Sequence, residues 1–185
     1  MDSFETARLL LRPRTAADFD ACLAMDRDPE VIRYVGAPWS NEAEHLAFLR
    51  QRMETIYPPG LGYWTIVPQD DPASFLGWIM LCPCTVAGAE VEIGWRLPRV
   101  AWGRGYATEA AAPILAQGFR NAEMSWVVAD IDPENLASLR VAEKIGLRYT
   151  GPVDYPGWPA RRYSLTREAF ERRRSARESA SPPGC

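Results

Sequence analysis

Residues 102–109 read Trp-Gly-Arg-Gly-Tyr-Ala-Thr-Glu, and the rest of the chain is organised around this stretch. Gly103, Gly105 and Ala107 carry almost no side chain, so successive backbone N–H groups can turn toward one point. The helix-forming run that follows, from about Thr108 to Phe119, places a helix N-terminus at that point. Unpaired amides and the helix dipole both favour an anion there. The stretch therefore predicts a phosphate-binding loop.

The segment immediately before this loop predicts a strand with two different faces. From Glu90 to Leu97 apolar and polar residues alternate, which is typical of a half-buried strand. One face carries Val91, Ile93, Trp95 and Leu97, and the other carries Glu90, Glu92, Gly94 and Arg96. The strand runs directly into the glycine-rich loop.

A strand, a glycine turn and a helix also occur in dinucleotide-binding folds. Two observations count against that fold: Thr108 stands where its fingerprint needs a third glycine, and the preceding strands are not separated by helices. A Walker loop is excluded because no Gly-Lys-Ser or Gly-Lys-Thr follows. An ordinary turn between strand and helix remains the structural alternative.

The composition predicts one globular domain. The chain has 185 residues, of which 47% are hydrophobic, enough for a single substantial core. We expect this domain to span residues 1–166, with a charged C-terminal helix and tail over 167–185 whose last residues are disordered. A net charge of −3 argues against a nucleic-acid partner, and glutamates interrupt the arginines of the tail. No long apolar run or signal peptide is present, so we expect no membrane partner and a cytoplasmic location.

Neither the cysteines nor the histidine indicates a metal site. Cys82 and Cys84 resemble half of a ligand set, but no second Cys or His pair follows them. We interpret the cysteines as buried, apolar thiols. His45, the only histidine, adjoins the apolar stripe of an expected helix and is more plausibly structural than catalytic.

The remaining pattern predicts a mixed α+β fold. An edge strand is expected over 7–12, helices over 15–25 and after Asn41, and strands over 62–67, 75–82 and 125–131, the last buried on both faces. A helix over 136–145 ends at Gly146, the αL cap position. Short strands near 147–150 and 161–165 flank a Pro- and Gly-rich loop.

A second motif follows the buried strand. Asn135 is succeeded after three residues by Ser138, after six more by Lys144 and after two more by Gly146. Together with the 102–109 loop, this segment resembles the GCN5-related N-acetyltransferase (GNAT) family. Within this family, the chain is most similar to the RimJ/RimL branch in three segments: the loop itself, the preceding Glu-Ile-Gly-Trp and the initial Arg-Leu-Leu-Leu-Arg-Pro. The resemblance covers about residues 8–165.

The resemblance implies a mixed, mostly antiparallel sheet that is flanked by helices and splayed in the middle, with acetyl-CoA in the opening and no metal. The backbone amides of the loop would bind the pyrophosphate: Gly103, Arg104, Gly105, Tyr106, Ala107 and Thr108. The backbone of Trp95, Arg96 and Leu97 would pair with the pantetheine arm as another strand does. Asn135 and Ser138 would lie near the thioester, and Asn135 can serve as a helix N-cap at the same time. For the Arg104 side chain, a phosphate contact and a solvated position both remain open.

Acetyl transfer to an amine requires a base, because only the neutral amine is a nucleophile. We expect Glu92 to be this base, since it lies on the strand that would carry the cofactor, although an exposed glutamate paired with Arg96 is the alternative. Asp132 is the reserve base and can equally cap the following turn.

The general acid is less defined. Many family members have a tyrosine seven residues after the motif asparagine, where this chain has Ala142. The departing thiolate would then be helped by the Ser138 hydroxyl, by water, or by no dedicated acid. We expect an N-acetyltransferase that acts on a protein N-terminal α-amine or a small-molecule amine, with a homodimer suggested by analogy. The alternative is a CoA-binding regulatory or structural domain without catalysis.

Overall fold

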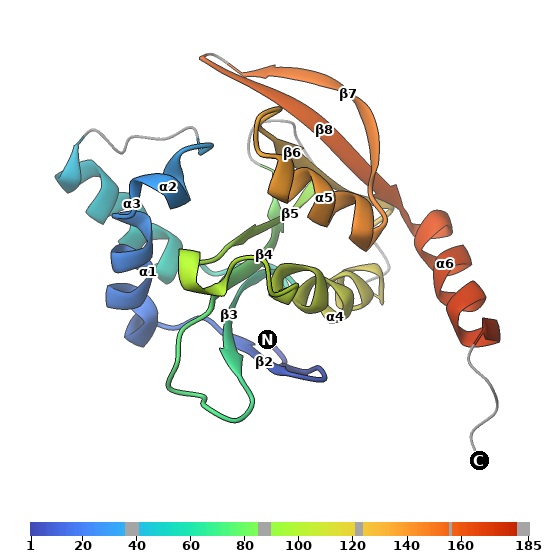
Figure 1. Cartoon of the computed structure of the whole chain (residues 1–185), viewed down its shortest axis with the longest axis horizontal. Coiled ribbons are helices and arrows are strands. Elements are labelled where there is room, and N and C mark those ends of the chain that lie inside the picture. Colours follow the sequence, from blue (N-terminus) through green and yellow to red (C-terminus); the bar gives the residue numbers. More distant parts are fainter. Residues whose placement is uncertain (36–40, 85–89, 121–123, 156, 181–185) are drawn as a thin grey trace.

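The computed structural model describes residues 1–35, 41–84, 90–120, 124–155 and 157–180. Its centre is an eight-stranded sheet with helices on both faces (Figure 1). The strands are β1 Phe4–Glu5, β2 Leu9–Pro13, β3 Gly62–Pro68, β4 Gly77–Pro83, β5 Val91–Arg96, β6 Trp126–Ile131, β7 Arg148–Tyr155 and β8 Trp158–Thr166. The helices are α1 Phe19–Asp26, α2 Pro29–Ile32, α3 Glu42–Glu54, α4 Tyr106–Arg120, α5 Leu136–Ile145 and α6 Arg167–Ala180, with 3₁₀ turns at Ala16–Asp18 and Arg99–Ala101.

The sheet is splayed between its two central strands. Its order is β1-β2-β3-β4-β5-β6-β8-β7, and every pair is antiparallel except β5 and β6. These two strands run parallel and pair only at Val91 with Val127 and Glu92 with Val128. Beyond Glu92 they separate, so the remaining edge of β5 has no strand partner on the β6 side. The expected fold class, a mostly antiparallel sheet that opens in the middle, is confirmed.

The two faces of the sheet bury different sets of helices. On the α4/α5 face, inward side chains such as Trp64, Ile79 and Ile93 pack with Ile114 of α4 and Leu139 of α5. The α1/α3 face comprises Tyr63, Trp78, Met80 and Cys82, which pack with Cys22 and Met25 of α1 and Leu49 of α3. Because side chains alternate along β5, Glu92 lies on the α1/α3 face, opposite Cys82 of β4.

Local capping signals were read correctly from the sequence. Asn41 caps α3 by accepting from Ala43 N–H at 3.0 Å, and Asn135 caps α5 by accepting from Ser138 N–H at 3.1 Å. Gly146 ends α5 with φ 106°, a left-handed conformation that favours glycine. These contacts span at most a few residues, so the sequence alone indicates them.

Three expected elements differ from the structure. β2 is not the edge strand, because the two-residue β1 pairs with it on the outer side. Trp126 at the start of β6 is exposed, whereas Val127 to Ala129 are buried as expected. The described residues of the expected Pro- and Gly-rich loop extend β7 and β8 instead, with Tyr155 pairing with Trp158 and Asp154 with Pro159. Pro152 is tolerated there because β7 is an edge strand.

The C-terminal helix packs onto the domain. Phe170 of α6 stacks on Phe119 of α4 with ring centroids 4.9 Å apart. Arg167 donates to the carbonyls of Phe119 and Met124. None of the described helices combines the length and the apolar character needed to cross a membrane.

Candidate active site

The glycine-rich loop and the first residues of α4, residues 103–108, form the candidate anion site, called the cradle below. Gly103 and Gly105 adopt φ values of 72° and 80°, which other residues rarely adopt. The first backbone amide of α4 that donates to a preceding carbonyl is that of Glu109, which bonds to the Gly105 carbonyl at 3.0 Å. The amides of Tyr106, Ala107 and Thr108 therefore have no partner within the helix and are available to an anion.

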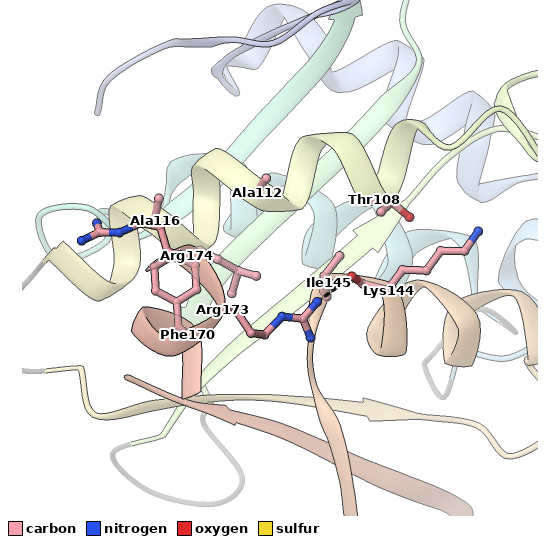
Figure 2. Close-up of a pocket in the computed structure, with 9 residues that line it drawn as sticks. Thr108, Ala112, Ala116, Lys144, Ile145, Phe170, Arg173 and Arg174 are labelled. Atoms are coloured by element: carbon pink, nitrogen blue, oxygen red, sulfur yellow. Dashed lines mark hydrogen bonds between the residues drawn. The ribbon is translucent and has the colours of Figure 1, made fainter. Parts of the chain in front are cut away.

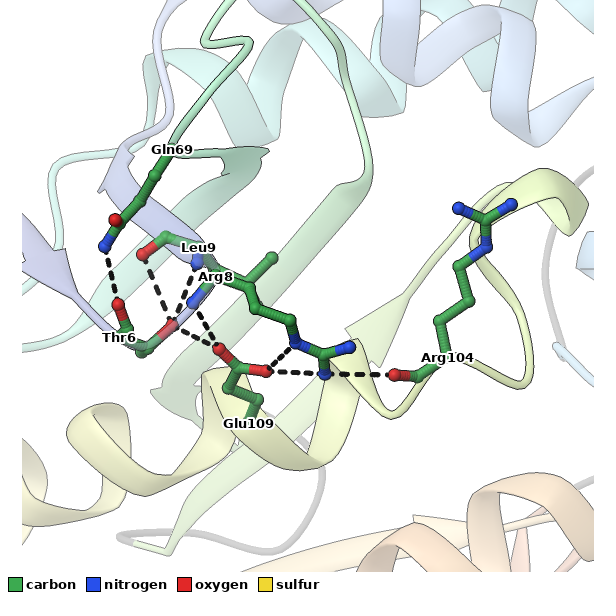
Figure 3. A network of polar contacts seen from close by, with 6 residues as sticks. All are labelled: Thr6, Arg8, Leu9, Gln69, Arg104 and Glu109. Carbon is green, nitrogen blue, oxygen red and sulfur yellow. Dashed lines mark hydrogen bonds and ion pairs between the residues drawn. The ribbon is translucent and has the colours of Figure 1, made fainter.

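Arg8 fastens this cradle to the N-terminal strands. Its guanidinium donates to the Glu109 carboxylate at 2.8 Å and to the Arg104 carbonyl at 3.0 Å, as Figure 3 shows. Glu109 also accepts from the Thr6 hydroxyl at 2.7 Å. Partial burial acts to raise the pKa of Glu109, but the bonds from Thr6 and Arg8 outweigh it and hold that pKa below its usual value. Glu109 is therefore a stable counter-ion for Arg8.

The Arg104 side chain takes no part in this network. Figure 3 shows its guanidinium extending away from the pair formed by Arg8 and Glu109. Within the described part of the chain it makes no hydrogen bond or ion pair, and residue 104 is exposed. It is thus available either to solvent or to an anion at the cradle.

The free edge of β5 lies beside the opening of the sheet. Leu97, just beyond the strand, is buried, and its carbonyl accepts from the Trp102 indole at 2.7 Å, which ties the loop to the strand. Trp95 reaches toward α5 and donates from its indole to the Ser138 hydroxyl at 3.3 Å. Arg96 directs its guanidinium to Asp26 of α1 at 2.7 Å, so only its backbone remains at the edge. The residues expected at the thioester, Asn135 and Ser138, lie together in the first turn of α5.

Glu92 has the environment of a general base. It is half-buried, and its carboxylate receives no hydrogen bond or ion pair from the described residues. Burial, reinforced by the negative charge of Asp130, raises its pKa to about 7, while the charges of Arg52 and Arg162 oppose the shift. The alternative pairing with Arg96 is not formed, because Arg96 contacts Asp26. A carboxylate that titrates near neutrality is suited to accept a proton from an ammonium group.

A cluster of charged side chains, each with an ion-pair or hydrogen-bond partner, lies on the β6 side of the opening. Arg162 of β8 contacts Asp130 of β6 at 2.7 Å and Glu90 at 2.9 Å. Tyr155 donates to Asp130 as well. Burial and the contact with Asp130 raise the pKa of the Tyr155 hydroxyl, so it stays protonated. One guanidinium thus serves two carboxylates, so the cluster, with Tyr155 protonated, keeps an excess of negative charge.

The reserve base, Asp132, and the structural histidine, His45, both make contacts that support the fold. Asp132 accepts from Glu134 N–H at 2.8 Å and so shapes the turn before α5. His45 is buried, and its Nε2 lies 3.3 Å from the Asp26 carboxylate, where α3 packs on α1. Among the described residues, no group of His, Cys, Asp and Glu side chains has the arrangement of a metal site.

A cavity of about 230 Å³ lies outside the sheet, between α4, the end of α5 and α6 (Figure 2). Thr108 at one end links it to the cradle, and neither Glu92 nor Ser138 lines it. The full lining consists of Thr108, Ala112, Leu115, Ala116, Lys144, Ile145, Phe170, Arg173 and Arg174. Arg173 also donates to the Lys144 carbonyl at 3.3 Å, at the C-terminal end of α5.

Sequence reasoning missed the groups that support the expected site. Arg8 and Glu109 fasten the loop, and Asp130 and Arg162 set the electrostatics around Glu92. The only available signal was weak: Arg8 and Glu109 both stand inside the motifs that carried the resemblance. Their pairing depends on contacts between distant segments.

Comparisons with known proteins agree with this geometry. A family model described as "Acetyltransferase (GNAT) domain" matches residues 8–148. The uncharacterised protein YkkB of Bacillus subtilis is 38% identical over 128 residues, covering 68% of this chain and 73% of YkkB. The uncharacterised N-acetyltransferase YnaD of the same organism is 27% identical over 171 residues, covering 89% of this chain and 97% of YnaD. A solved acetyltransferase structure from Agrobacterium tumefaciens superposes with a TM-score of 0.77 at 26% identity, covering 89% of this chain and 94% of that one.

Proposed function

This chain belongs to the GNAT family of N-acetyltransferases, and we propose on that basis that it transfers the acetyl group of acetyl-CoA directly to a primary amine. The observation that carries the proposal is the position of Glu92. Its carboxylate has a pKa of about 7 and no partner among the described residues, and it stands where β5 and β6 separate. The anion cradle follows on the same segment of chain, after β5.

Acetyl-CoA supplies the reactive thioester, and the chain supplies its binding groups. The amides from Gly103 to Thr108 would hold the pyrophosphate through the unpaired first turn of α4. The edge of β5 at Trp95 to Leu97 would pair with the pantetheine amides by strand addition. Asn135 uses its side-chain oxygen to cap α5, so its amide NH₂ remains as a donor toward the same arm.

Glu92 would take a proton from the acceptor ammonium. The neutral amine then attacks the thioester carbonyl, the carbon–sulfur bond breaks, and the CoA thiolate leaves. Ser138 would assist the thiolate, and its hydrogen bond supports this role: its oxygen accepts from Trp95, so its own proton remains free to donate. Ala142, at the position where many members have tyrosine, is fully buried and contributes no acid.

The buried Ala142 also favours a second candidate function, a CoA-binding regulatory domain without catalysis. Release of CoA thiol from acetyl-CoA, measured with a panel of peptides and small amines, separates the two functions. Turnover that Glu92→Gln reduces supports the enzyme. CoA binding without turnover on any acceptor supports the binding domain.

The finer assignments are proposals carried by the motif residues. We propose that the chain belongs to the RimJ/RimL-like branch and that its acceptors are protein N-terminal α-amines or small amines; the loop and the initial Arg-Leu-Leu-Leu-Arg-Pro support this proposal. A cytoplasmic location and a homodimeric assembly belong to the same proposal.

A further inference from the structure

On the α1/α3 face, four described carboxylates pair with an arginine, whereas Glu92 pairs with none. Asp18 pairs with Arg12 at 2.6 Å, and Asp26 pairs with Arg96 at 2.7 Å. Asp130 and Glu90 share Arg162, as described above. Within the described residues, Glu92 is therefore the carboxylate of this group that lacks an ion-pair partner.

The same face carries two half-buried arginines that pair with no described carboxylate, Arg14 and Arg52. Both contact Tyr63. The guanidinium of Arg14 lies 3.6 Å from the centre of the Tyr63 ring and donates to the Arg52 carbonyl at 3.2 Å. Arg52 donates to the Tyr63 hydroxyl and lies 4.4 Å from the ring centre of Phe48. Contacts with rings and neutral oxygens orient these cations but do not neutralise their charge.

These two cations lie toward Glu92 across the sheet. Cys82 is the cross-strand neighbour of Glu92, so their β-carbons are about 5 Å apart. Tyr57 bonds to Cys82 and packs on Tyr63, with ring centroids 5.8 Å apart. The positive charge of Arg52 acts to lower the pKa of both Cys82 and Glu92, against burial. One carboxylate without an ion-pair partner and two arginines without one thus share the α1/α3 face of the sheet.

We propose that the acceptor is a small zwitterionic amine, whose carboxylate binds Arg14 and Arg52 while its ammonium group faces Glu92. This inference rests on the proposed acetyl transfer and narrows its substrate class to molecules resembling α-amino acids. A peptide N-terminus places its carboxylate too far from the amine to use both sites. A polyamine would bring further positive charge against the two arginines.

The reaction leaves the recognised carboxylate unchanged. Glu92 takes one proton from the ammonium, the amine nitrogen bonds to the acetyl carbon, and the thiolate departs with the electrons of the carbon–sulfur bond. The nitrogen then loses its second proton, and the product is an N-acetyl carboxylate that has lost its positive charge. The product consequently retains contact with the arginines but not with Glu92.

The test compares L-amino acids with their carboxamides, which keep the amine and lack the carboxylate. We expect kcat/KM, measured by thiol release, to be at least about tenfold higher for the acid, the size of one charge-assisted contact. The amide has the less basic amine, so chemistry alone favours the opposite order. Arg52→Gln and Arg14→Gln should each reduce the preference severalfold, and Arg52→Lys should restore part of it.

Arg50→Gln is the matched control. Arg50 lies on α3, as Arg52 does, and is exposed. Its guanidinium also lies near an aromatic ring, 5.5 Å from the ring centre of Phe19. This variant should keep the preference, and all variants should keep the wild-type affinity for CoA in calorimetry. Equal kcat/KM for acid and amide, or a preference for spermidine, would overturn the inference while leaving acetyl transfer intact.

Binding of the same acids and amides to the CoA-loaded protein, followed by calorimetry, separates this inference from the proposed function. If no acceptor is turned over but acids bind more tightly and Arg52→Gln removes that difference, acetyl transfer fails and the anion site stands. If acids and amides bind alike, the anion site fails.

Discussion

Arg8 and Glu109, which are 101 residues apart in sequence, form an ion pair of 2.6 Å at the edge of the anion cradle. The same guanidinium donates to the Arg104 carbonyl and lies 4.8 Å from the centre of the Tyr106 ring. Two residues of the loop are therefore held by one side chain from the segment before β2. The conformation of the loop is therefore supported by a distant part of the chain as well as by its glycines.

Arg8→Gln should weaken CoA binding while leaving the fold intact. Half of the Arg8 side chain is exposed, so the ion pair itself adds at most about 1 kcal/mol to stability. Loss of the contact with the Arg104 carbonyl loosens the cradle, and we expect the Kd for CoA to rise about 5- to 20-fold. Calorimetry measures this change. Arg148→Gln, at an exposed site on β7, is the control and should bind CoA as the wild type does.

Gly105→Glu should abolish detectable CoA binding. Gly105 has a φ of 80°, so any β-carbon there is strained, and a carboxylate at the cradle repels phosphate. Gly151→Glu introduces the same side chain at another positive φ, 144°, with open space around it on β7. If both variants fold and both retain CoA affinity, the pyrophosphate binds elsewhere.

Glu92→Gln should lower kcat/KM by about a hundredfold without changing the Kd for CoA, which is the loss expected for a general base. The wild-type rate should fall below a pH of about 7, because the carboxylate must be ionised to accept a proton. The pH–rate profile of Glu92→Gln should lack this decrease at low pH. Asp132→Asn tests the reserve base, and because Asp132 serves the turn before α5 we expect less than about a threefold effect on kcat/KM. A wild-type pH profile in Glu92→Gln would remove Glu92 from the mechanism.

The same substitution should stabilise the protein at alkaline pH. The pKa of Glu92 is raised from 4.5 to about 7 on folding, so between these values the folded chain holds a proton that the unfolded chain has released. Wild-type stability therefore falls as pH rises through this window, whereas glutamine has no proton to lose. Between about pH 4 and about pH 8, the free energy of unfolding of Glu92→Gln should rise relative to that of the wild type by at most about 3 kcal/mol. Urea unfolding at several pH values measures it, and parallel stability curves would contradict the raised pKa.

Ser138→Ala should reduce kcat more than it changes CoA affinity. The hydroxyl accepts from Trp95 and keeps its proton for the thiolate, a contribution of about tenfold if it acts as the donor. Trp95→Phe removes the indole donor but leaves the hydroxyl, so it should affect kcat less. Unchanged kcat in Ser138→Ala under single-turnover conditions would show that the thiolate leaves without this acid.

Features set by neighbouring residues were accessible from the sequence. The loop glycines, the Asn135 cap and the Gly146 terminator act within one helical turn, so their residue types indicate their conformations. Alternation along Val91–Arg96 likewise placed Glu92 on the polar side of its strand. The hairpin of β7 and β8 was underestimated because Pro and Gly signal a loop, while cross-strand pairing decided the outcome.

The sequence by itself determined the glycine-rich loop, the helix caps and the strand on which the candidate base lies, because each depends on the backbone chemistry of adjacent residues. Tertiary structure decided the electrostatics. The pKa of Glu92 depends on its burial and on Asp130 and Arg52, which come from a different strand and a helix. The clamp of Arg8 on Glu109 and the uncompensated pair of Arg14 and Arg52 likewise join distant segments. Distances across a sheet and the exclusion of water arise only when the chain is folded, and they set the charge balance around the opening.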